Sequence, residues 1–196
     1  MTQKKRLKIK GVNVFSLSGM ATFKGFIKNG LDSSVMINLI VCFDSKFDEF
    51  RKRDFTFPPN LFYFHKVSHP EVVGVLINTF NFTEKEAKES LKKLIEEFNL
   101  NKLMRDELTD ESYEKLVEEA NDRIVKKENN EDLRIGDQDI IIIGGFLKNK
   151  INFIHSGDEN FKKTCEELKL NVIPLPKRDI EKEEKIKELM KRRQKD

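Results

Sequence analysis

The sequence is poor in the residues that build covalent or zinc-bound scaffolds. It contains two cysteines and three histidines among 196 residues, and it has no tryptophan. Cys42 and Cys165 are isolated, so no CxxC pair is available for a zinc site and no disulfide framework is expected. Both lie in apolar or helical patterns, which predicts buried free thiols. We assign no metal role to His65, His69 or His155, and we expect His155, inside a strand, to be a core or surface side chain.

Long apolar runs are also absent. The longest, Ile140 to Leu147, is far shorter than the roughly 20 residues that a bilayer-spanning helix needs. No secretory apolar segment follows the N-terminal basic residues. We therefore expect no membrane contact and a reducing, cytoplasmic location. With 38% apolar and 36% charged residues, the chain can form one globular core.

Acidic residues are missing from positions 1–30, which carry seven basic residues although the net charge of the chain is only +3. A block of this kind suits phosphate contact, although a solvated terminus is its commoner meaning. Weak alternation broken at Gly11, Gly19 and Gly25 predicts a hairpin or arm over residues 1–25. The candidate phosphate-binding residues of this arm are Lys4, Lys5, Arg6, Lys8 and Lys10.

Hydrophobic periodicity predicts strands that alternate with helices, which indicates an α/β domain with a parallel sheet and right-handed crossovers. The main domain is expected over 26–176, with a charged helical insertion at about 84–134 and a charged helical tail over 177–196. The predicted strands are 26–31, 61–64, 151–155 and 172–175. One helix is predicted to begin at Val35, with Ser33 or Ser34 as its N-cap, and another is predicted to begin at Ser68–Pro70. Further helices are predicted over 84–98, 109–127, 138–148 and 159–168.

Acidic residues follow the predicted strands at one edge of the sheet. Asp32 ends the first strand, Glu71 lies in the first helical turn after the second, and Asp158 follows the strand 151–155. Functional groups of open parallel sheets collect at this edge. Asp139 begins the helix that leads into the strand 151–155, so strand direction alone does not bring it there. For each acid a simpler role is open, namely capping a helix or complementing its dipole.

Four segments, taken in order, resemble the motifs of the PIN-domain family. Gly30-Leu-Asp-Ser-Ser-Val-Met-Ile resembles the strand-ending LDTNVLI pattern, and Ser156-Gly-Asp-Glu-Asn-Phe resembles the T-x-D-x-x-F turn. Between them, the segment around Glu71 resembles the family's acid near a helix start, and Asp139-Ile-Ile-Ile-Ile-Gly-Gly resembles its D-x-x-I-A-A helix. The polar Lys28-Asn-Gly before Asp32 departs from the apolar first strand that is usual in the family.

The resemblance implies a three-layer α/β/α sandwich with a central parallel sheet of strand order 3-2-1-4-5. It implies an acidic pocket formed by Asp32, Glu71, Asp139 and Asp158 that binds Mg²⁺ or Mn²⁺. Supporting roles fall to Ser156, which would steady the first acid, and to Ser34. Asp137 competes with Asp139 for the third acid, and Asp139 is favoured because Gly144 then falls where the family has a small helix-packing residue. Gly144 and Gly145 are expected to pack their helix against the sheet.

Electrostatics gives the same pocket a physical reason to bind cations. Two carboxylates 4 Å apart repel by about 4 kcal/mol at an effective dielectric of 20, so a cluster of four keeps its charge only with bound cations or takes up protons. Hard oxygen ligands favour Mg²⁺ or Mn²⁺. Such ions would orient a phosphodiester, supply hydroxide and stabilise the leaving oxygen.

The first hypothesis is therefore a metal-dependent endoribonuclease, either a toxin-type RNase or, slightly favoured, an RNA-processing enzyme. Its partners would be RNA, a protein antitoxin or an RNA-processing protein, and the family resemblance suggests a homodimer. The alternative is an inactive PIN-like protein that binds RNA or serves as a scaffold. A nuclease acting on structured DNA is less favoured, because no DNA-binding motif is visible.

Overall fold

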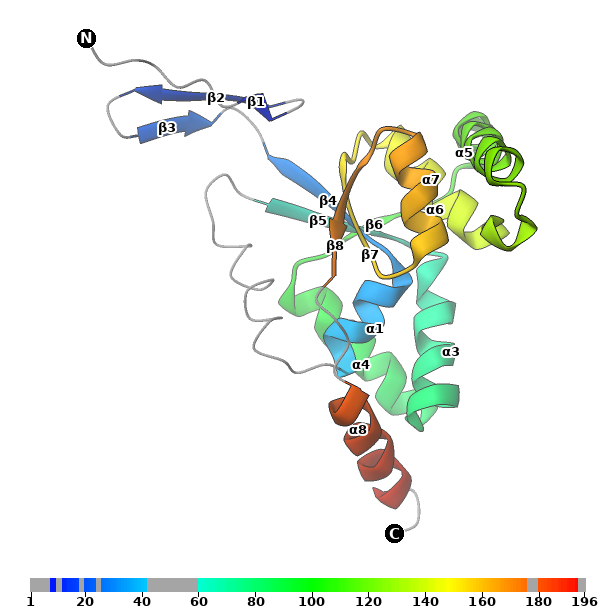
Figure 1. Cartoon of the computed structure of the whole chain (residues 1–196). Coiled ribbons are helices and arrows are strands. Elements are labelled where there is room, and N and C mark those ends of the chain that lie inside the picture. The colour runs from blue at the N-terminus through cyan, green and yellow to red at the C-terminus, as the bar shows by residue number, and fades with distance from the viewer. Residues whose placement is uncertain are drawn as a thin grey trace.

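A five-stranded parallel sheet forms the centre of the protein (Figure 1). The structure is a computed structural model that describes residues 8–9, 12–17, 20–23, 26–41, 60–175 and 180–193. The strands are β4 (Ile27–Leu31), β5 (Asn60–His65), β6 (Asn101–Leu103), β7 (Phe153–Ser156) and β8 (Asn171–Pro174). Their order is β6-β5-β4-β7-β8, and every neighbouring pair is parallel. Counted along the chain within this sheet, the order is 3-2-1-4-5, which confirms the prediction.

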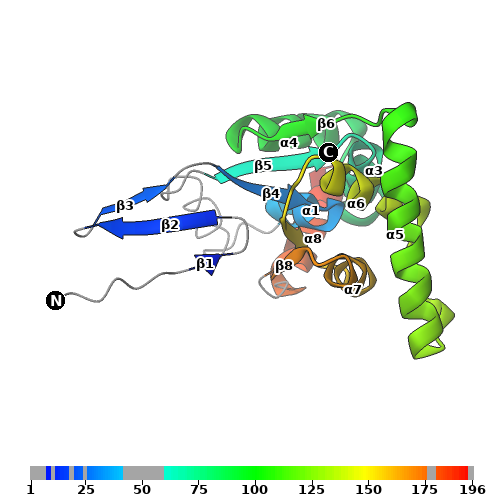
Figure 2. The ribbon, with the colours of Figure 1, turned by 90° about the horizontal axis from the view of Figure 1, so that it is seen from above.

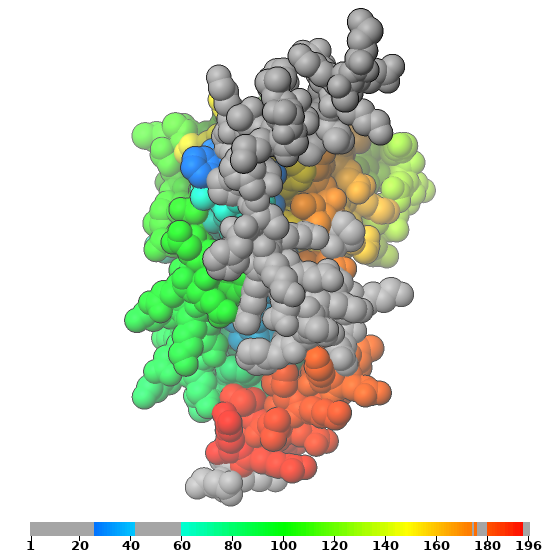
Figure 3. Space-filling view, turned by 90° about the vertical axis from the view of Figure 1, so that its left-hand side faces the viewer, coloured from blue at the N-terminus to red at the C-terminus, as the bar shows by residue number. Residues whose placement is uncertain are grey.

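Helices cover both faces of the sheet, so the architecture is the expected three-layer sandwich (Figures 1 and 2). One face carries α1 (Ser33–Val41), α3 (Ser68–Phe80), α4 (Glu84–Glu97) and α8 (Ile180–Arg193). The other carries α5 (Glu107–Glu128), α6 (Asp137–Lys148) and α7 (Glu159–Glu167), with a short 3₁₀ turn, η1 (Glu131–Leu133), between α5 and α6. In Figure 3, α8 occupies one end of the molecule, where Lys187 Nζ lies 5.6 Å from the centre of the Phe80 ring of α3.

The strands supply the two hydrophobic cores alternately, as the two-residue period of a strand requires. Phe62 and Phe64 of β5 belong to the core beneath α1, α3 and α4. Tyr63, between them, packs against the core beneath α5, α6 and α7, together with Ile154 of β7 and Phe146 of α6. Because helices cover both faces of the sheet, its central strands are largely buried.

A second, antiparallel sheet precedes the domain. It consists of β1 (Lys8–Ile9), β2 (Val12–Leu17) and β3 (Met20–Phe23) in the order β1-β2-β3. Residues 1–7, 10, 11, 18, 19, 24 and 25 lie outside the described part of the chain, as do 42–59, which include Cys42. Within the described residues, no helix is long and apolar enough to cross a membrane.

The polar residues of β4 occupy a central strand, and each has a structural reason to be there. The Lys28 side chain passes beside the ring of Tyr63 and donates from Nζ to the Asn149 carbonyl at 2.9 Å. The ring of Phe146 lies directly over Gly30, where a Cβ atom would meet ring carbons at 2.8 to 3.0 Å. Only glycine fits beneath that ring, so the unusual first strand is a consequence of helix packing.

Asn29 of β4 is the middle of a buried polar chain on the other face of the sheet. Its Nδ2 donates to Asn60 Oδ1 at 3.0 Å, and its Oδ1 lies 3.1 Å from His155 Nε2. Asn29 and His155 are 4% and 1% exposed. His155 is thus a core residue, one of the two roles expected for it, and it joins β7 to β4 through side chains as well as backbone.

Two predicted helix starts differ from the structure, and one strand was not predicted. The first helix begins at Ser33, so both serines lie inside its first turn, and neither precedes it as the N-cap. The helix expected from Thr109 begins two residues earlier and is capped by Asp106, whose Oδ1 accepts the Leu108 N–H at 3.2 Å. The capping box at Thr83 is confirmed. The region 84–134 also contributes β6, which the periodicity did not reveal because it is only three residues long.

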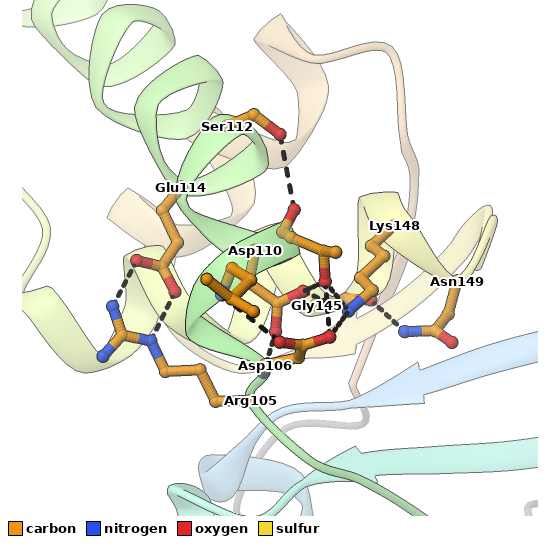
Figure 4. A network of polar contacts seen from close by, with 10 residues as sticks. Arg105, Asp106, Asp110, Ser112, Glu114, Gly145, Lys148 and Asn149 are labelled. Carbon is orange, nitrogen blue, oxygen red and sulfur yellow. Dashed lines mark hydrogen bonds and ion pairs between the residues drawn. The ribbon is translucent and has the colours of Figure 1, made fainter.

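Charged side chains fasten the start of α5 to the end of α6 (Figure 4). Lys148 of α6 forms an ion pair with the buried Asp110 at 2.5 Å. Beside it, Arg105 donates two 2.7 Å hydrogen bonds to the carboxylate of Glu114, a bidentate geometry that is among the stronger ion pairs. The close approach of α5 and α6 places these groups on facing turns.

Gly144 and Gly145 were both expected to pack α6 against the sheet, and the structure confirms this for Gly145 alone. A Cβ on Gly145 would lie 2.8 Å from Cδ2 of His65 in β5. A Cβ on Gly144 would lie 3.2 Å from the backbone nitrogen of Glu114 in α5. Gly145 thus packs α6 against the sheet, whereas Gly144 packs it against a neighbouring helix.

Substitution of Gly30 tests the packing of the central strand. Gly30→Ala should lower the free energy of unfolding by about 1 to 3 kcal/mol, because the buried Phe146 ring must move to admit the methyl group. Gly74→Ala is the matched control, since a Cβ there meets nothing within 4 Å inside α3. The control should raise stability by about 0.5 to 1 kcal/mol. Urea denaturation of both variants measures the difference, and equal effects would contradict this packing.

Candidate active site

Asp32 lies at the carboxyl end of β4, where the strand passes directly into α1. Its side chain is 4% exposed. Oδ1 accepts the backbone N–H of Ser33 at 2.6 Å, and Oδ2 accepts the hydroxyls of Ser34 and Ser156 at 2.8 and 2.9 Å. Its own N–H donates to the His155 carbonyl of β7 at 3.1 Å. Three donors therefore hold one buried carboxylate in a single orientation.

The end of β7 supplies the next group of contacts. Ser156 is fully buried, and its Oγ also accepts the Asp158 N–H at 3.0 Å. The Gly157 N–H donates to Ser34 Oγ at 2.9 Å, so the β7 turn is tied to α1. Asp158 is exposed and caps α7, with Oδ1 accepting the Phe161 N–H at 2.8 Å. Asp158 thus caps a helix and lies beside the Asp32 hydrogen-bond network as well.

Glu71 reaches the same network through a residue that sequence reasoning considered only as a helix cap. Glu71 is exposed in the first turn of α3, as predicted. Its Oε2 accepts the hydroxyl of Ser33 at 2.6 Å, and Ser33 is only 2% exposed. Ser33 therefore contacts two acids, Asp32 through its backbone and Glu71 through its side chain. Ser33 follows Asp32 directly and lies at the start of a helix, and this position is the sequence signal that could have identified Ser33 as a site residue.

Asp139 also lies within electrostatic reach of the other three acids. α6 begins at Asp137 after Gly136, whose N–H donates to Asp139 Oδ2 at 3.3 Å. Because a crossover helix runs antiparallel to the strands, its first turn returns to the carboxyl edge of the sheet, which strand direction alone did not reveal. Asp139 is partly buried, whereas Asp137 is exposed.

The pKa values show how strongly these acids act on one another. Burial raises the pKa of Asp139 to about 6, helped by the negative charges of Asp32, Asp158 and Glu71. Burial also raises the pKa of Asp32, and Glu71 adds to the rise, while hydrogen bonds from the three serines oppose it. The four acids therefore form one electrostatic unit, which is buried at Asp32 and open to solvent at Glu71 and Asp158.

Within the described residues, no three histidine, cysteine, aspartate or glutamate side chains lie close enough to hold a metal ion as they stand. The histidines stay outside the acid cluster. His65 and His69 are four positions apart, but His65 is buried at the end of β5 and His69 is exposed on α3, so they do not form a helical ligand pair. Cys165 is a buried free thiol, as predicted, and burial raises its pKa well above the usual value.

The structure describes only one of the five candidate phosphate-binding residues of the arm. Lys4, Lys5, Arg6 and Lys10 lie outside the described residues, and Lys8 belongs to β1. The small antiparallel sheet precedes the N-terminal end of β4, whereas Asp32 follows its C-terminal end. A contact between the arm and the acids stays a prediction.

The fold has solved counterparts, although no protein-family model and no curated protein matches the chain. A chain in the crystal structure of VapBC2 from Rickettsia felis, bound to a DNA fragment from their promoter, superposes with a TM-score of 0.55 and 11% sequence identity. A chain of DNA-bound VapBC from Salmonella typhimurium gives a TM-score of 0.54 and 11% identity. Each alignment covers 76% of this chain and 98% of the other.

The chain has a PIN-like fold. Its strand order and its three layers agree with the expectation drawn from the four sequence motifs. At 11% identity the likeness concerns the fold, and it assigns no role to individual residues.

The raised pKa of Asp139 predicts a pH-dependent cost to stability. An acid whose pKa is higher in the folded state than in the unfolded chain destabilises the fold progressively as pH rises from about 4 to about 6. Asp139→Asn removes this cost and keeps an acceptor for Gly136. Because solvent screens a partly buried group, the variant should gain on the order of 1 to 2 kcal/mol at pH 7.5. The gain should vanish below pH 4 in urea denaturation; a gain that is independent of pH would refute the assignment.

The contact between Ser33 and Glu71 predicts energetic coupling between α1 and α3. In a double-mutant cycle of Ser33→Ala and Glu71→Ala, the coupling free energy should be about 1 kcal/mol, as for a hydrogen bond to a charged group that is partly exposed. Pairing Ser33→Ala with Glu89→Ala, on the exposed face of α4, should give additive effects within about 0.5 kcal/mol. Additivity in the first cycle would show that the contact contributes nothing in solution.

Proposed function

We propose that the protein is a divalent-metal-dependent endoribonuclease whose catalytic acids are Asp32, Glu71, Asp139 and Asp158. The observation that carries this proposal is the hydrogen-bond network at the carboxyl edge of the PIN-like sheet, in which Ser33 contacts both Asp32 and Glu71, and Ser156 contacts both Asp32 and the Asp158 N–H. Clustered carboxylates of this kind retain their charge near pH 7 when a cation is present. A perturbed acid in such a position is a candidate for function, although structural ion networks also perturb acids.

The donor chemistry of the cluster fits Mg²⁺ or Mn²⁺. Each of Glu71, Asp139 and Asp158 uses one carboxylate oxygen for a hydrogen bond, and within the described residues the other oxygen accepts none. Asp32 Oδ2 accepts two hydrogen bonds and Oδ1 accepts one, which leaves a lone pair on Oδ1. All available donors are hard oxygens, which these ions prefer over histidine or thiolate sites.

The surrounding residues would keep the acids in place during the reaction. When bound, the metal would supply hydroxide from water and stabilise charge on the phosphate oxygens. Ser34 and Ser156 would hold Asp32 in one orientation, and Ser33 would hold Glu71 beside it. The buried Cys165 takes no part, and no covalent nucleophile is required.

The biological setting follows from the same proposal. The solved counterparts are VapBC complexes, which supports a protein partner of the antitoxin type and assembly with a second copy. A role in RNA processing, with an RNA-processing protein as partner, is the other setting consistent with the site. We propose a cytoplasmic location for either. The alternative function, an inactive RNA-binding or scaffold protein, would retain the fold without using the acids.

Metal binding and cleavage in the wild type and in Asp32→Asn/Asp158→Asn test the proposal. The wild type should bind Mn²⁺ in calorimetry and cleave single-stranded RNA. The double variant should lose metal binding and at least 100-fold in cleavage rate, as expected when a charge-stabilising group is removed. Glu118→Gln, an exposed change on α5, is the control and should behave as wild type.

Each contrary result has a definite meaning. Cleavage that survives in the double variant would rule out these acids as the catalytic centre. A wild type that neither binds Mn²⁺ nor cleaves RNA would favour the scaffold function. Unfolding curves of the variants should accompany the assay, so that a loss of activity can be separated from a loss of folded protein.

A further inference from the structure

Two lysines and a histidine gather near the acid cluster, at the start of α3 and on the neighbouring edge strand. Lys66 lies in the turn between β5 and α3, His69 in the first turn of α3, and Lys102 on β6, and all three are exposed. Lys102 pairs in register with Phe64 of β5. The Lys66 N–H donates to the Leu103 carbonyl at 2.9 Å, and the His69 N–H donates to the Lys66 carbonyl at 3.0 Å. Backbone hydrogen bonds therefore hold these positions together; we call them the α3 basic patch.

The charges within the patch are near one another and largely uncompensated. Burial lowers the pKa of His69, and the positive charges of Lys102 and Lys88 lower it further. Both ammonium groups therefore act on this side chain. Lys88 of α4 is paired with Glu84. In the part of the chain that the structure describes, neither Lys66 nor Lys102 forms an ion pair with an acidic side chain. The two lysines are therefore available to an external anion.

The patch adjoins the candidate active site through α3. His69 and Glu71 share the first turn of that helix, and Glu71 is tied to Ser33, the neighbour of Asp32. A phosphate chain that approaches four acids meets repulsion, which nearby fixed positive charge would offset. The small antiparallel sheet precedes the N-terminal end of β4, whereas the α3 basic patch lies at the carboxyl edge of the sheet, as the acids do.

We infer that the α3 basic patch binds the phosphate backbone of a single-stranded RNA and leads it to the acid cluster. This inference rests on the proposed ribonuclease function and names the surface that would hold its substrate. Lys66 and Lys102 provide two exposed point charges, and His69 provides an exposed ring that can stack on a base. The edge position of β6 leaves the patch open at the side of the sheet, where an extended strand can lie.

Binding can be measured without cleavage by using the Asp32→Asn protein in EDTA with a fluorescently labelled oligouridylate. Lys66→Gln/Lys102→Gln in that background should weaken the affinity at least tenfold at low salt. Two lost phosphate contacts should also reduce the slope of log K against log salt by about 1.4. Lys115→Gln/Lys126→Gln, two exposed lysines of α5, remove the same charge and form the matched control. The control should change the affinity less than twofold and leave the slope unchanged.

The outcomes separate this inference from the proposed function. Equal losses in the patch and control variants would overturn the patch, since net charge alone would then explain binding. An equal loss for double-stranded DNA would overturn the assignment to single-stranded RNA. If the wild type fails to cleave but the patch variant still loses affinity selectively, the patch stands and the nuclease function fails. If the wild type cleaves while the patch variant binds normally, the patch fails alone. Unchanged unfolding curves should accompany both variants, because the four lysines are exposed.

Discussion

The buried carboxylate of Asp32 is the constraint on which the site depends. A carboxylate taken out of water is costly unless hydrogen bonds replace its hydration. Here two hydroxyls and one backbone N–H replace it, and they come from α1 and from the end of β7. This requirement fixes the positions of three elements at once, because β4, α1 and β7 must meet at one point. The serines that satisfy Asp32 also hold Glu71 and the turn that carries Asp158.

The four acids differ in their exposure to solvent. Asp32 is buried and fixed, Asp139 is partly buried, and Glu71 and Asp158 face solvent. Burial raises the pKa of Asp139 to about 6, and the negative charges of Asp32, Asp158 and Glu71 add to the rise. A nearby cationic surface at α3 would complement this arrangement, since a polyanion needs attraction close to the acids that repel it.

Particular residues show how far the sequence could predict the structure. The periodicity and the capping signals predicted the strand and helix alternation, and the motif order predicted the PIN-like sheet. The three-residue strand β6 was not identified, because so short a segment carries no resolvable alternation. The helix α5 begins at Glu107 rather than at the predicted Thr109, because Asp106 is its N-cap. Asp106 and Thr109 are both acceptable N-caps by residue type, so the sequence did not distinguish them. The glycine in the polar strand β4 is explained by the Phe146 ring, which lies directly over Gly30 and leaves no room for a side chain.

By itself, the sequence determined the α/β class, because the alternation of strands and helices depends on local periodicity. The strand order and the candidate acids followed from the resemblance of four short motifs to the PIN-domain family, and the sheet has that strand order. The sequence could not determine that Asp139 approaches the other three acids, since that depends on how α6 crosses the sheet. It also could not show that Ser33 joins Asp32 to Glu71, or that Lys66 and Lys102 lie beside His69. Those contacts join residues that are distant in the chain, and only the packing of helices on the sheet brings them within reach.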